Sequence, residues 1–470
     1  MARRALEDRL VTSPVHVVVM AAGQGKRMRS SRPTVLHPIA GRPMLAHVLD
    51  AARAIAPVAI AVVVGHGGDE VERALAGDGL TFVRQDPPRG TGDAVRVALA
   101  ALPRDGVTVV INGDTPLIPG RLLQALAERA SRGHLALLTA HVPDPMGLGR
   151  VVRDGAGSVR RIVEDRDATP AERAIDEIYT GSLAAPTALL AAWVARLAPH
   201  NAQNEYYLTD VVAASVADAV TVDAVVAPDE CDARGINDRA QLAEVERIVQ
   251  RRRAETLMRA GTSIADPARF DLRGTLECGD DVAIDVGCIF EGRVVLHDGV
   301  RVGPYCVLRD TSVGAGSEVR AFSVVDGAAI GANAWVGPYA RLRPGTELAD
   351  GVHVGNFVEV KASRLGRGSK ANHLAYVGDT TIGERVNFGA GSITANYDGA
   401  NKHRTVIGDD ASIGSNVVLV APVDVGEGAT VGGGSTVSKS VPAGELTVAR
   451  ARQVTVPGWK RPTKKPRGSG

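Results

Sequence analysis

Two stretches of this chain carry residue types suited to chemistry on phosphates and on amines. In the first, the apolar residues 15–20 run directly into the loop AAGQG at 21–25. Glycines that follow a strand let backbone N–H groups surround a nucleotide base and its phosphates. In the second, His373 lies in the polar segment SKANHLAY. Histidine exchanges a proton most readily near neutral pH, so His373 is a candidate general base.

The glycine loop needs a strand before it and a sheet around it. Short apolar runs bounded by Gly, Pro or Asp recur along the first half of the chain, at 15–21, 58–64, 107–112 and 135–139. Amphipathic stretches lie between them, at 44–55 and 93–102. Alternating strands and helices predict an α/β domain over about 15–238, with a mostly parallel sheet and helices on both faces.

His373 lies in a repetitive region, about 261–456. An aliphatic residue recurs at every sixth position, as at Ile330, Val336, Leu342, Leu348, Val354 and Val360, and again at Ile407, Ile413, Leu419, Val425, Val431 and Val437. Glycine often follows, which suits a tight corner. Stacked short strands with inward aliphatics form a parallel β-helix, whereas a β-sandwich would alternate with a period of two. The period of six therefore predicts a hexapeptide-repeat prism.

Between these regions, residues 239–260 show apolar positions at helical spacing and end at Gly261. They predict one long helix, either a core helix or, because the composition changes sharply here, an interdomain linker. We therefore expect a domain at 1–239, a linker helix at 240–260 and a repeat domain at 261–470. The basic, Pro- and Gly-containing tail from residue 460 is expected to be disordered.

Composition argues against several classes of protein. The formal net charge is +1, which gives no general attraction to nucleic acid or to an anionic membrane. No run of about 18 apolar residues is present, so no membrane insertion is expected. The four cysteines form no C-x-x-C pair, which predicts free thiols in a reducing compartment. The charged first ten residues do not form a signal peptide, so we expect a cytoplasmic protein.

Five motifs in the repeat region make a family recognisable: RLRPG at 341–345, VGNFVEVK at 354–361, GSKANHLAYVGD at 368–379, NYDGANKHRT at 396–405 and LVAPV at 419–423. From about residue 15 to residue 459, the chain resembles the bacterial bifunctional N-acetylglucosamine-1-phosphate uridyltransferase / glucosamine-1-phosphate acetyltransferase family. The resemblance implies a Rossmann-like nucleotidyltransferase domain, a long linker helix and a left-handed parallel β-helix. It also implies a homotrimer with active sites between subunits.

For the acetyltransferase half, the resemblance implies that His373 is the catalytic base for N-acetylation of glucosamine 1-phosphate. Arg343 and Lys361 match phosphate-binding positions, and Tyr376 and Asn387 match sugar-binding positions. A fork of donors and a point charge suit a phosphate. By the same resemblance, acetyl-CoA is bound by Ala390, Asn396, Tyr397, Ser415, Gly433 and Arg450. The segment that begins at Asn396 breaks the six-residue step, and such insertions are where solenoids build sites.

For the other half, the resemblance implies uridylyl transfer from UTP to N-acetylglucosamine 1-phosphate. The matching UDP-sugar positions are Met20, Ala21, Ala22, Gly23, Thr34, Gln85, Gly90, Thr91, Asn112, Gly149, Glu164, Tyr179 and Asn237. Asp114 and Asn237 match the ligands of Mg²⁺, an ion that prefers such oxygen donors. The metal neutralises charge while the sugar phosphate attacks the α-phosphorus and pyrophosphate leaves.

The nucleotidyltransferase half departs from the family pattern at several positions. Thr34 stands where the family has a phosphate-contacting lysine, and Lys26 stands where it has threonine. Tyr179 replaces a sugar-binding asparagine, and Asp93 replaces the usual histidine. Loss of one such charge typically lowers a rate by about 100- to 1,000-fold.

One hypothesis is that Arg27, with or without Lys26, compensates for the missing charge. The alternative is an acetyltransferase whose nucleotidyltransferase domain is weak or respecialised. A third class, a nucleotidyltransferase that uses its β-helix only for oligomerisation, is disfavoured because the acetyltransferase positions all match.

Overall fold

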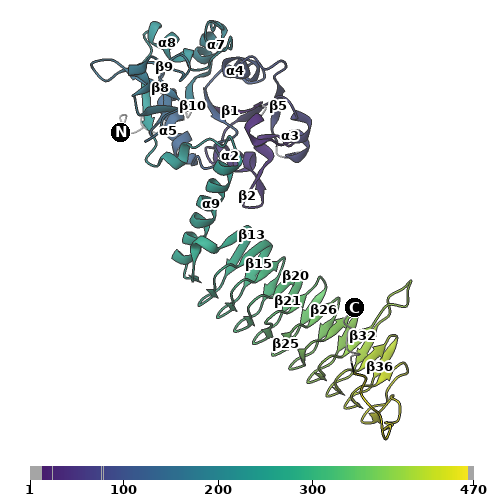
Figure 1. Cartoon of the computed structure of the whole chain (residues 1–470). Helices are drawn as coiled ribbons and strands as arrows, with labels where there is room; N and C mark the ends of the chain where they lie inside the picture. The colour runs from purple at the N-terminus through teal and green to yellow at the C-terminus, as the bar shows by residue number, and fades with distance from the viewer. Residues whose placement is uncertain (1–12, 24, 76, 78, 464–470) are drawn as a thin grey trace, which may run out of the picture. The chain divides into compact units, whose positions relative to one another are not determined.

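The computed structural model describes residues 13–463 apart from 24, 76 and 78. The chain divides into two compact units, Met1–Val249 and Gln250–Gly470 (Figure 1). Each unit has its own hydrophobic core. Residues 464–470 of the tail that was expected to be disordered lie outside the described residues.

The first unit is built on a mixed sheet. Its strands are β1 (Val15–Ala21), β4 (Ala59–Val64), β5 (Thr81–Arg84), β6 (Val107–Asn112), β7 (Leu135–His141), β8 (Gly149–Arg153), β9 (Val159–Val163), β10 (Glu177–Pro186) and β11 (Val222–Val226). The main path runs β11-β7-β10-β6-β1-β4-β5, with β8 and β9 attached through β10. Pro38–Ile39 and Arg42–Pro43 form the separate hairpin β2–β3.

Helices cover both faces of this sheet, as the alternating pattern predicts. They are α2 (Met44–Arg53), α3 (Gly68–Ala74), α4 (Thr91–Leu99), α5 (Gly120–Ser131), α6 (Pro170–Arg173), α7 (Thr187–Ala195) and α8 (Asp210–Ala217), with 3-10 turns at Lys26–Met28, Thr34–Leu36 and Glu230–Ala233. Along β1, Val17 and Val19 enter one core while Val18 enters the other. A strand that is buried on both faces must be continuously apolar, which explains the sequence of β1.

The expectation of a mostly parallel sheet holds for β1, β4, β5 and β6 but not for β10. This strand runs antiparallel to both β6 and β7. Its register shifts between Tyr179 and Leu183, and Tyr179 pairs with Gly149 of β8. The reversed strand therefore brings two residues far apart in the sequence to one edge of the sheet.

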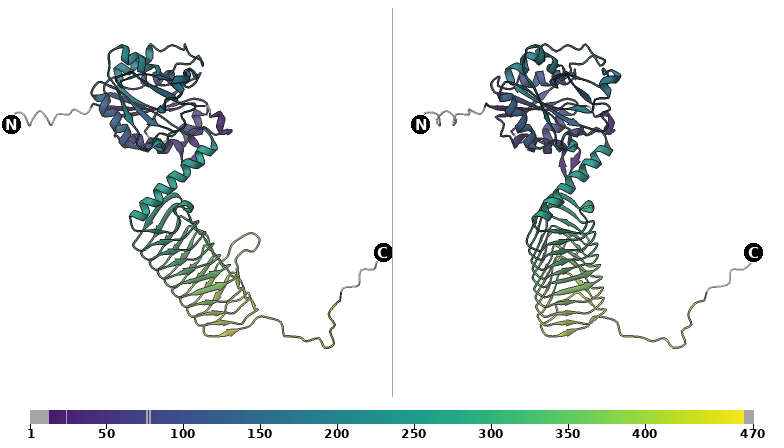
Figure 2. Two further views of the ribbon diagram at one scale, coloured as in Figure 1. Left: turned by 60° about the vertical axis from the view of Figure 1, so that its left-hand side comes forward. Right: turned by 90° about the vertical axis from the view of Figure 1, so that its left-hand side faces the viewer.

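The second unit is a solenoid of short parallel strands (Figure 2). One sheet contains β12 (Ser263–Ile264), β14 (Ala283–Ile284), β16 (Arg301–Val302), β19 (Glu318–Val319), β22 (Trp335–Val336), β25 (His353–Asn356), β28 (Lys370–His373), β31 (Asn387–Phe388), β34 (Ser412–Ile413), β37 (Thr430–Val431) and β39 (Leu446–Thr447).

A second sheet contains the remaining strands of the solenoid. They are β13 (Asp271–Cys278), β15 (Ile289–Leu296), β17 (Val307–Arg309), β18 (Ser312–Val313), β20 (Val324–Asp326), β21 (Ala328–Ile330), β23 (Arg341–Leu342), β24 (Thr346–Leu348), β26 (Glu359–Lys361), β27 (Arg364–Leu365), β29 (Tyr376–Gly378), β30 (Thr380–Ile382), β32 (Ile393–Ala395), β33 (Thr405–Ile407), β35 (Val418–Val420), β36 (Val423–Val425) and β38 (Thr436–Val437). The 3-10 turn Pro267–Arg269 precedes β13.

The six-residue pattern is explained by the core of this solenoid. All twelve aliphatics of the two predicted series are buried in one hydrophobic cluster. Leu342 pairs with Val360, and Val360 pairs with Val377, so equivalent residues stack from coil to coil. The step is interrupted between β32 and β33, where a loop extends from the coils (Figure 2).

The helix expected at 239–260 is α9, Arg239–Arg259. Val245 belongs to a cluster with Ile39 and Met44 of the first unit. Beyond Val249, the Gln250 amide exchanges two hydrogen bonds with the Leu272 backbone, at 3.1 and 2.7 Å. Ala254 is buried in the solenoid core. The division between the units thus falls inside this helix.

In the part of the chain that the structure describes, no helix combines the length and apolar character needed to cross a bilayer.

Candidate active sites

An open cavity of ≈ 670 Å³ lies at the carboxyl ends of β1 and β6 in the first unit. Most of the residues predicted to bind the UDP-sugar line it: Met20, Ala21, Ala22, Gly23, Thr34, Gln85, Gly90, Thr91, Asn112 and Asn237, together with Asp114. The parallel strands explain this arrangement, because their carboxyl ends share one edge of the sheet. The sequence motifs scattered over residues 20–237 therefore converge on one place.

A second cavity of ≈ 220 Å³ adjoins the first and shares Met20, Thr91 and Asn112 with it. It is lined by the other predicted sugar-binding residues, Gly149, Glu164 and Tyr179. Burial raises the pKa of the Glu164 carboxyl, which accepts a 3.1 Å hydrogen bond from the Thr209 hydroxyl. The hydroxyl of Tyr179 is buried without a hydrogen-bond partner in the described residues. Its burial raises the pKa of Tyr179.

Asp114 follows β6 and is the centre of the predicted metal site. Burial raises the pKa of its carboxyl to about 6, and the positive charge of Arg27 partly opposes this shift. Its Oδ1 is buried without a partner within the described residues. A buried carboxylate with an orphaned oxygen fits a cation, which would supply the missing interaction.

Arg27 lies in the same cavity, and its guanidinium donates a 2.6 Å hydrogen bond to Oδ1 of Asn237. Asn237 is the second predicted metal ligand, so the guanidinium contacts one of the oxygens assigned to the metal. Together with Asp114, these side chains form a charged group at the edge of the cavity. An arginine here can neutralise a phosphate.

Thr34 lies within a 3-10 turn, with 9% of its surface exposed. Its hydroxyl oxygen is buried and unpartnered among the described residues. A Cβ at Gly25 would lie 1.8 Å from that oxygen, and Gly25 has a positive φ of 56°. Glycine is therefore required at position 25 for both space and conformation. Thr34 contributes no charge to the cavity.

In the solenoid, the second site is arranged as a column of equivalent positions at one corner. Backbone N–H groups of successive coils donate hydrogen bonds of 2.8–3.2 Å to backbone carbonyls, in turn those of Asn356, His373, Ala390 and Ser415. The same register places Gly433 next in this corner column, which thus consists of Asn356, His373, Ala390, Ser415 and Gly433. The predicted base therefore lies in line with three residues predicted to bind acetyl-CoA.

The imidazole of His373 has one clear partner. Its Nδ1 lies 2.9 Å from Oδ1 of Asn356, which is paired with His373 across β25 and β28. In this structure the Asn356 amide turns its oxygen toward the ring, and with an acceptor there Nδ1 carries the proton and Nε2 keeps its lone pair. The exposed imidazole is thus held in the tautomer that can act as a base at Nε2.

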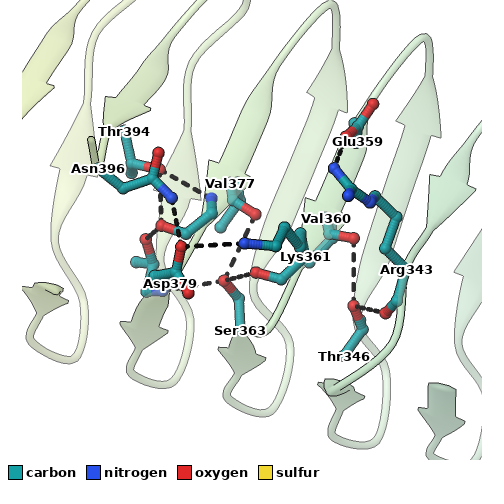
Figure 3. Close-up of polar contacts among 12 residues, drawn as sticks. Arg343, Thr346, Glu359, Val360, Lys361, Ser363, Val377, Asp379, Thr394 and Asn396 are labelled. Atoms are coloured by element: carbon teal, nitrogen blue, oxygen red, sulfur yellow. Dashed lines mark hydrogen bonds and ion pairs between the residues drawn. The ribbon is translucent and has the colours of Figure 1, made fainter. Parts of the chain in front are cut away.

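The predicted phosphate-binding cations lie beside two carboxylates (Figure 3). Arg343 donates a 2.8 Å hydrogen bond to Glu359, and the Lys361 ammonium lies 3.3 Å from Oδ2 of Asp379. The Asn396 amide donates to the same oxygen of Asp379 (Figure 3). One carboxylate oxygen therefore contacts both a predicted phosphate-binding residue and a predicted acetyl-CoA-binding residue.

The loop that breaks the repeat places Lys402 beside Lys361, and the neighbouring Lys361 lowers the pKa of Lys402. The loop closes on itself: the Tyr397 hydroxyl donates to the Gly399 carbonyl at 2.6 Å, and His403 contacts Asp398 at 2.7 Å. Hydrogen bonds from the backbone N–H of Asn401, from His403 and from the backbone N–H of Ala400 hold the pKa of the Asp398 carboxyl well below its usual range. The loop thus adds a third cation to the group containing Arg343 and Lys361.

The remaining predicted residues lie on neighbouring elements. Tyr376 pairs with Glu359, and its ring covers Gly378, where a Cβ would lie 2.4 Å from the hydroxyl. Asn387 lies exposed on β31. Arg450 donates a 2.5 Å hydrogen bond to the carbonyl of Gly433, at the end of the corner column.

Three residues that complete the solenoid geometry were not assigned from the sequence: Asn356, Asp379 and Lys402. They occur inside the motifs that carry the resemblance, but only the stacking of coils shows what they contact. The available signal was a polar residue at a strand end, as at Asn356 and Asp379, and the break in the six-residue step around Lys402.

Comparison with known proteins finds matches for both halves of the chain. Residues 17–204 match the MobA-like NTP transferase domain, and residues 327–362 and 404–439 match the bacterial transferase hexapeptide (six repeats). Relatives named bifunctional protein GlmU match almost the whole chain. The protein from Methylibium petroleiphilum is 58% identical over 456 residues, covering 96% of this chain and 99% of the relative. Those from Cupriavidus pinatubonensis and Bordetella parapertussis are 54% and 56% identical, covering 96% of this chain and 99% and 100% of the relatives.

The contact between Asn356 and His373 predicts a tautomer that can be measured. In the wild-type chain, long-range ¹H–¹⁵N spectra of labelled histidine should show Nδ1 of His373 protonated. The change Asn356→Ala should shift the neutral ring toward the Nε2–H form, because the acceptor at Nδ1 is lost. His373→Gln assigns the signal, and Asn356→Asp, which retains an acceptor, should preserve the Nδ1–H form. An Nε2–H tautomer in the wild type would contradict the geometry.

Proposed function

The chain belongs to the family of bifunctional GlmU proteins, and we propose that it catalyses two steps of UDP-N-acetylglucosamine synthesis. In the solenoid, the amine of glucosamine 1-phosphate is acetylated by acetyl-CoA. In the first unit, N-acetylglucosamine 1-phosphate reacts with UTP to give UDP-N-acetylglucosamine and pyrophosphate. Both halves of the chain match family models, and the solenoid that the hexapeptide repeats form is a left-handed β-helix.

The single observation that carries the acetyltransferase is the orientation of His373 by Asn356. The Nε2 lone pair accepts a proton from the sugar ammonium, and the neutral amine attacks the thioester carbonyl of acetyl-CoA. The C–N bond forms, the C–S bond breaks, and CoA leaves as its thiol by taking up the proton that the acylated nitrogen releases. Proton transfer by such a base typically contributes about 100- to 10,000-fold to a rate.

The two substrates approach His373 from different sides of the corner. Arg343, Lys361 and Lys402 form the group of cations that suits the sugar phosphate. Tyr376 and Asn387 complete the sugar site.

Acetyl-CoA lies along the corner column, where Ala390, Ser415 and Gly433 offer little bulk to a thin pantetheine arm. Asn396, Tyr397 and Arg450 contact the remainder of the molecule. Gly433 lies next to Ser415, and any Cβ there would approach the Ser415 carbonyl to 3.2 Å, so the column is narrow at this point.

In the first unit, the loop at Ala21–Gly23 and the residues Gln85, Gly90 and Thr91 receive the base and phosphates of UTP. Glu164, Gly149 and Tyr179 receive the sugar, and the small adjoining cavity fits a single hexose. Asp114 and Asn237 would hold Mg²⁺, and the cation would neutralise the phosphates of the attacking and leaving groups. Arg27 directs its guanidinium toward the same place.

The threonine at position 34 is the main reason to keep the alternative, an acetyltransferase with a weak or respecialised nucleotidyltransferase domain. Thr34 is buried and uncharged in the cavity. Arg27 supports compensation, because it lines the same cavity and reaches Asn237. We therefore favour an active uridyltransferase in which arginine supplies the charge that Thr34 lacks.

We also propose that the active enzyme is a homotrimer in the cytoplasm. An aromatic ladder, defined as Tyr305, Phe322, Tyr339, Phe357 and Leu374, lies directly beside the corner column, and 44–63% of each side chain is exposed. Its rings stack with centroids 4.9–5.4 Å apart. A continuous exposed apolar strip marks a surface that packs on another protein. The four unpaired cysteines suit a reducing compartment.

The acetyltransferase proposal predicts the effect of His373→Ala. CoA release from acetyl-CoA and glucosamine 1-phosphate should fall by at least about 100-fold, because the base that Asn356 orients is lost. Uridylyl transfer should be unchanged, since its residues belong to the other unit, and serves as the internal control. Undiminished CoA release would show that His373 is not the base.

The compensation proposal predicts which residue supplies the charge. Wild-type protein should release pyrophosphate from UTP, Mg²⁺ and N-acetylglucosamine 1-phosphate, and Arg27→Gln should lower the rate by about 100- to 1,000-fold because the compensating charge is lost. Adding Thr34→Lys to Arg27→Gln should restore most of that rate. The matched control replaces Thr34 with methionine instead, because methionine has nearly the length of lysine but carries no charge. Background release by the pure wild-type protein would favour the acetyltransferase-only alternative.

The trimer proposal predicts that Phe322→Glu combined with Tyr339→Glu yields monomers by sedimentation velocity, because buried charges would oppose association. The rate of CoA release should fall as the trimer is lost, while the rate of pyrophosphate release should persist. Val58→Glu, at an exposed apolar residue of the first unit, should leave the mass unchanged. A wild-type monomer that retains full acetyltransferase activity would refute the trimer.

A further inference from the structure

Gln85 follows β5 and lines the larger cavity, although only 5% of its surface is exposed. Its amide nitrogen donates two hydrogen bonds. One goes to Oδ2 of Asp93 at 2.9 Å, and the other goes to the backbone carbonyl of Gly90 at 3.0 Å. Asp93 is equally buried and forms an ion pair with Arg96 one helical turn later. The amide nitrogen of Gln85 is therefore fully used inside the protein.

These two neighbours determine which way the amide faces. The oxygen and nitrogen of a glutamine amide have nearly the same shape, so only hydrogen-bond partners can distinguish them. A carboxylate and a backbone carbonyl are both acceptors. If the amide turned over, its oxygen would face two other oxygens and lose both hydrogen bonds, at a cost of about 1–3 kcal/mol for each buried group. The nitrogen must therefore face Asp93 and Gly90.

The Oε1 atom of Gln85 is consequently left for a ligand. Within the described residues, no protein donor contacts Oε1 of Gln85. This oxygen is also not one of the side-chain atoms there that are fully buried without a hydrogen-bond partner. Because Gln85 lines the cavity, this oxygen is accessible from that side. The cavity thus presents a fixed hydrogen-bond acceptor.

Further contacts hold the residues around Asp93 in place. The Arg96 guanidinium lies over the ring of Tyr206, 5.3 Å from its centroid. The backbone of Tyr206 bonds to Arg89 and to Gly92, each at 2.8 Å. At Gly90, φ is 108° and a Cβ would lie 2.6 Å from the Tyr206 carbonyl, so only glycine fits. The segment that carries the second acceptor for Gln85 is thereby held against the loop at Tyr206.

We propose that Asp93 is a positioning residue that fixes the Gln85 amide and thereby makes the nucleotide site select a base with a ring N–H donor. Uracil presents such a donor at N3, whereas cytosine presents a lone pair there. Facing a fixed carbonyl oxygen, cytosine would bring two acceptors together. The inference rests on the proposed nucleotidyltransferase function and adds to it the origin of base selectivity.

The test compares UTP with CTP in the full-length chain, by the ratio of kcat/KM for pyrophosphate release and by calorimetric binding of UDP and CDP. Wild-type protein should prefer the uridine nucleotides in both measurements. In Asp93→Leu only the Gly90 carbonyl still opposes a turned amide, so the preference should fall by about 10- to 100-fold, mainly through better use of CTP. A merely structural role would lower both nucleotides together and leave the ratio unchanged.

Arg96→Gln serves as the control, because it removes the ion pair but keeps the Asp93 carboxylate, and it should retain the preference for uridine. If Asp93→Leu does not fold, Asp93→Ala, which also removes the carboxylate acceptor, should show the same loss of preference.

The outcomes separate this inference from the function on which it rests. Wild-type protein that binds UDP in preference to CDP but releases no pyrophosphate would refute uridylyl transfer and leave the selectivity inference standing. Equal binding of the two nucleotides by the wild type would overturn it. An unchanged ratio in folded Asp93→Leu or Asp93→Ala would also overturn it.

Discussion

The backbone hydrogen bonds between successive coils are the constraint on which the solenoid site depends. Because each coil pairs in parallel with the next, a residue at one position is aligned with its equivalents above and below. This alignment is what turns Asn356, His373 and Ala390 into neighbours. The chemistry therefore needs no special loop to bring the base and its orienting amide together. The aliphatic core that holds the coils in register also holds the base in its tautomer.

In the first unit, the residues of the site are positioned in a different way. There the sheet supplies a common edge, and the side chains that matter arrive on separate connections. Polar pairs then orient individual groups, as the buried Asp93 does for Gln85 and as Asn356 does for the exposed His373 in the other unit. In both places an acceptor of fixed position leaves the neighbouring group only one way to face. Small polar residues outside the reacting centre can thus set what a site accepts.

The sequence predicted the architecture well wherever a period was visible. The six-residue step identified the stacked aliphatics, and the apolar runs at 15–21 and 107–112 coincide with β1 and β6. The reversed direction of β10 was not visible, because a strand's direction depends on the connections that precede it. The contacts of Asp379, Lys402 and Asn356 were not visible either. Each spans two coils, and the loop after Asn396 changes the spacing between equivalent positions.

The solenoid also has a bearing on how its length can vary. The coils that precede β23 in the chain carry aliphatic core residues and residues of the aromatic ladder, but none of the groups around His373. Gaining or losing one complete coil there would restore every column in register. Small differences in coil length are absorbed at the corners, because Val307 pairs with Val324 and Arg341 pairs with Glu359, 17 and 18 residues apart, without loss of register. The prism thus behaves as a modular spacer whose length can change by whole coils. The long interruption after β32 lies beside the reacting groups, where a protruding loop adds a cation and leaves the coils that follow aligned.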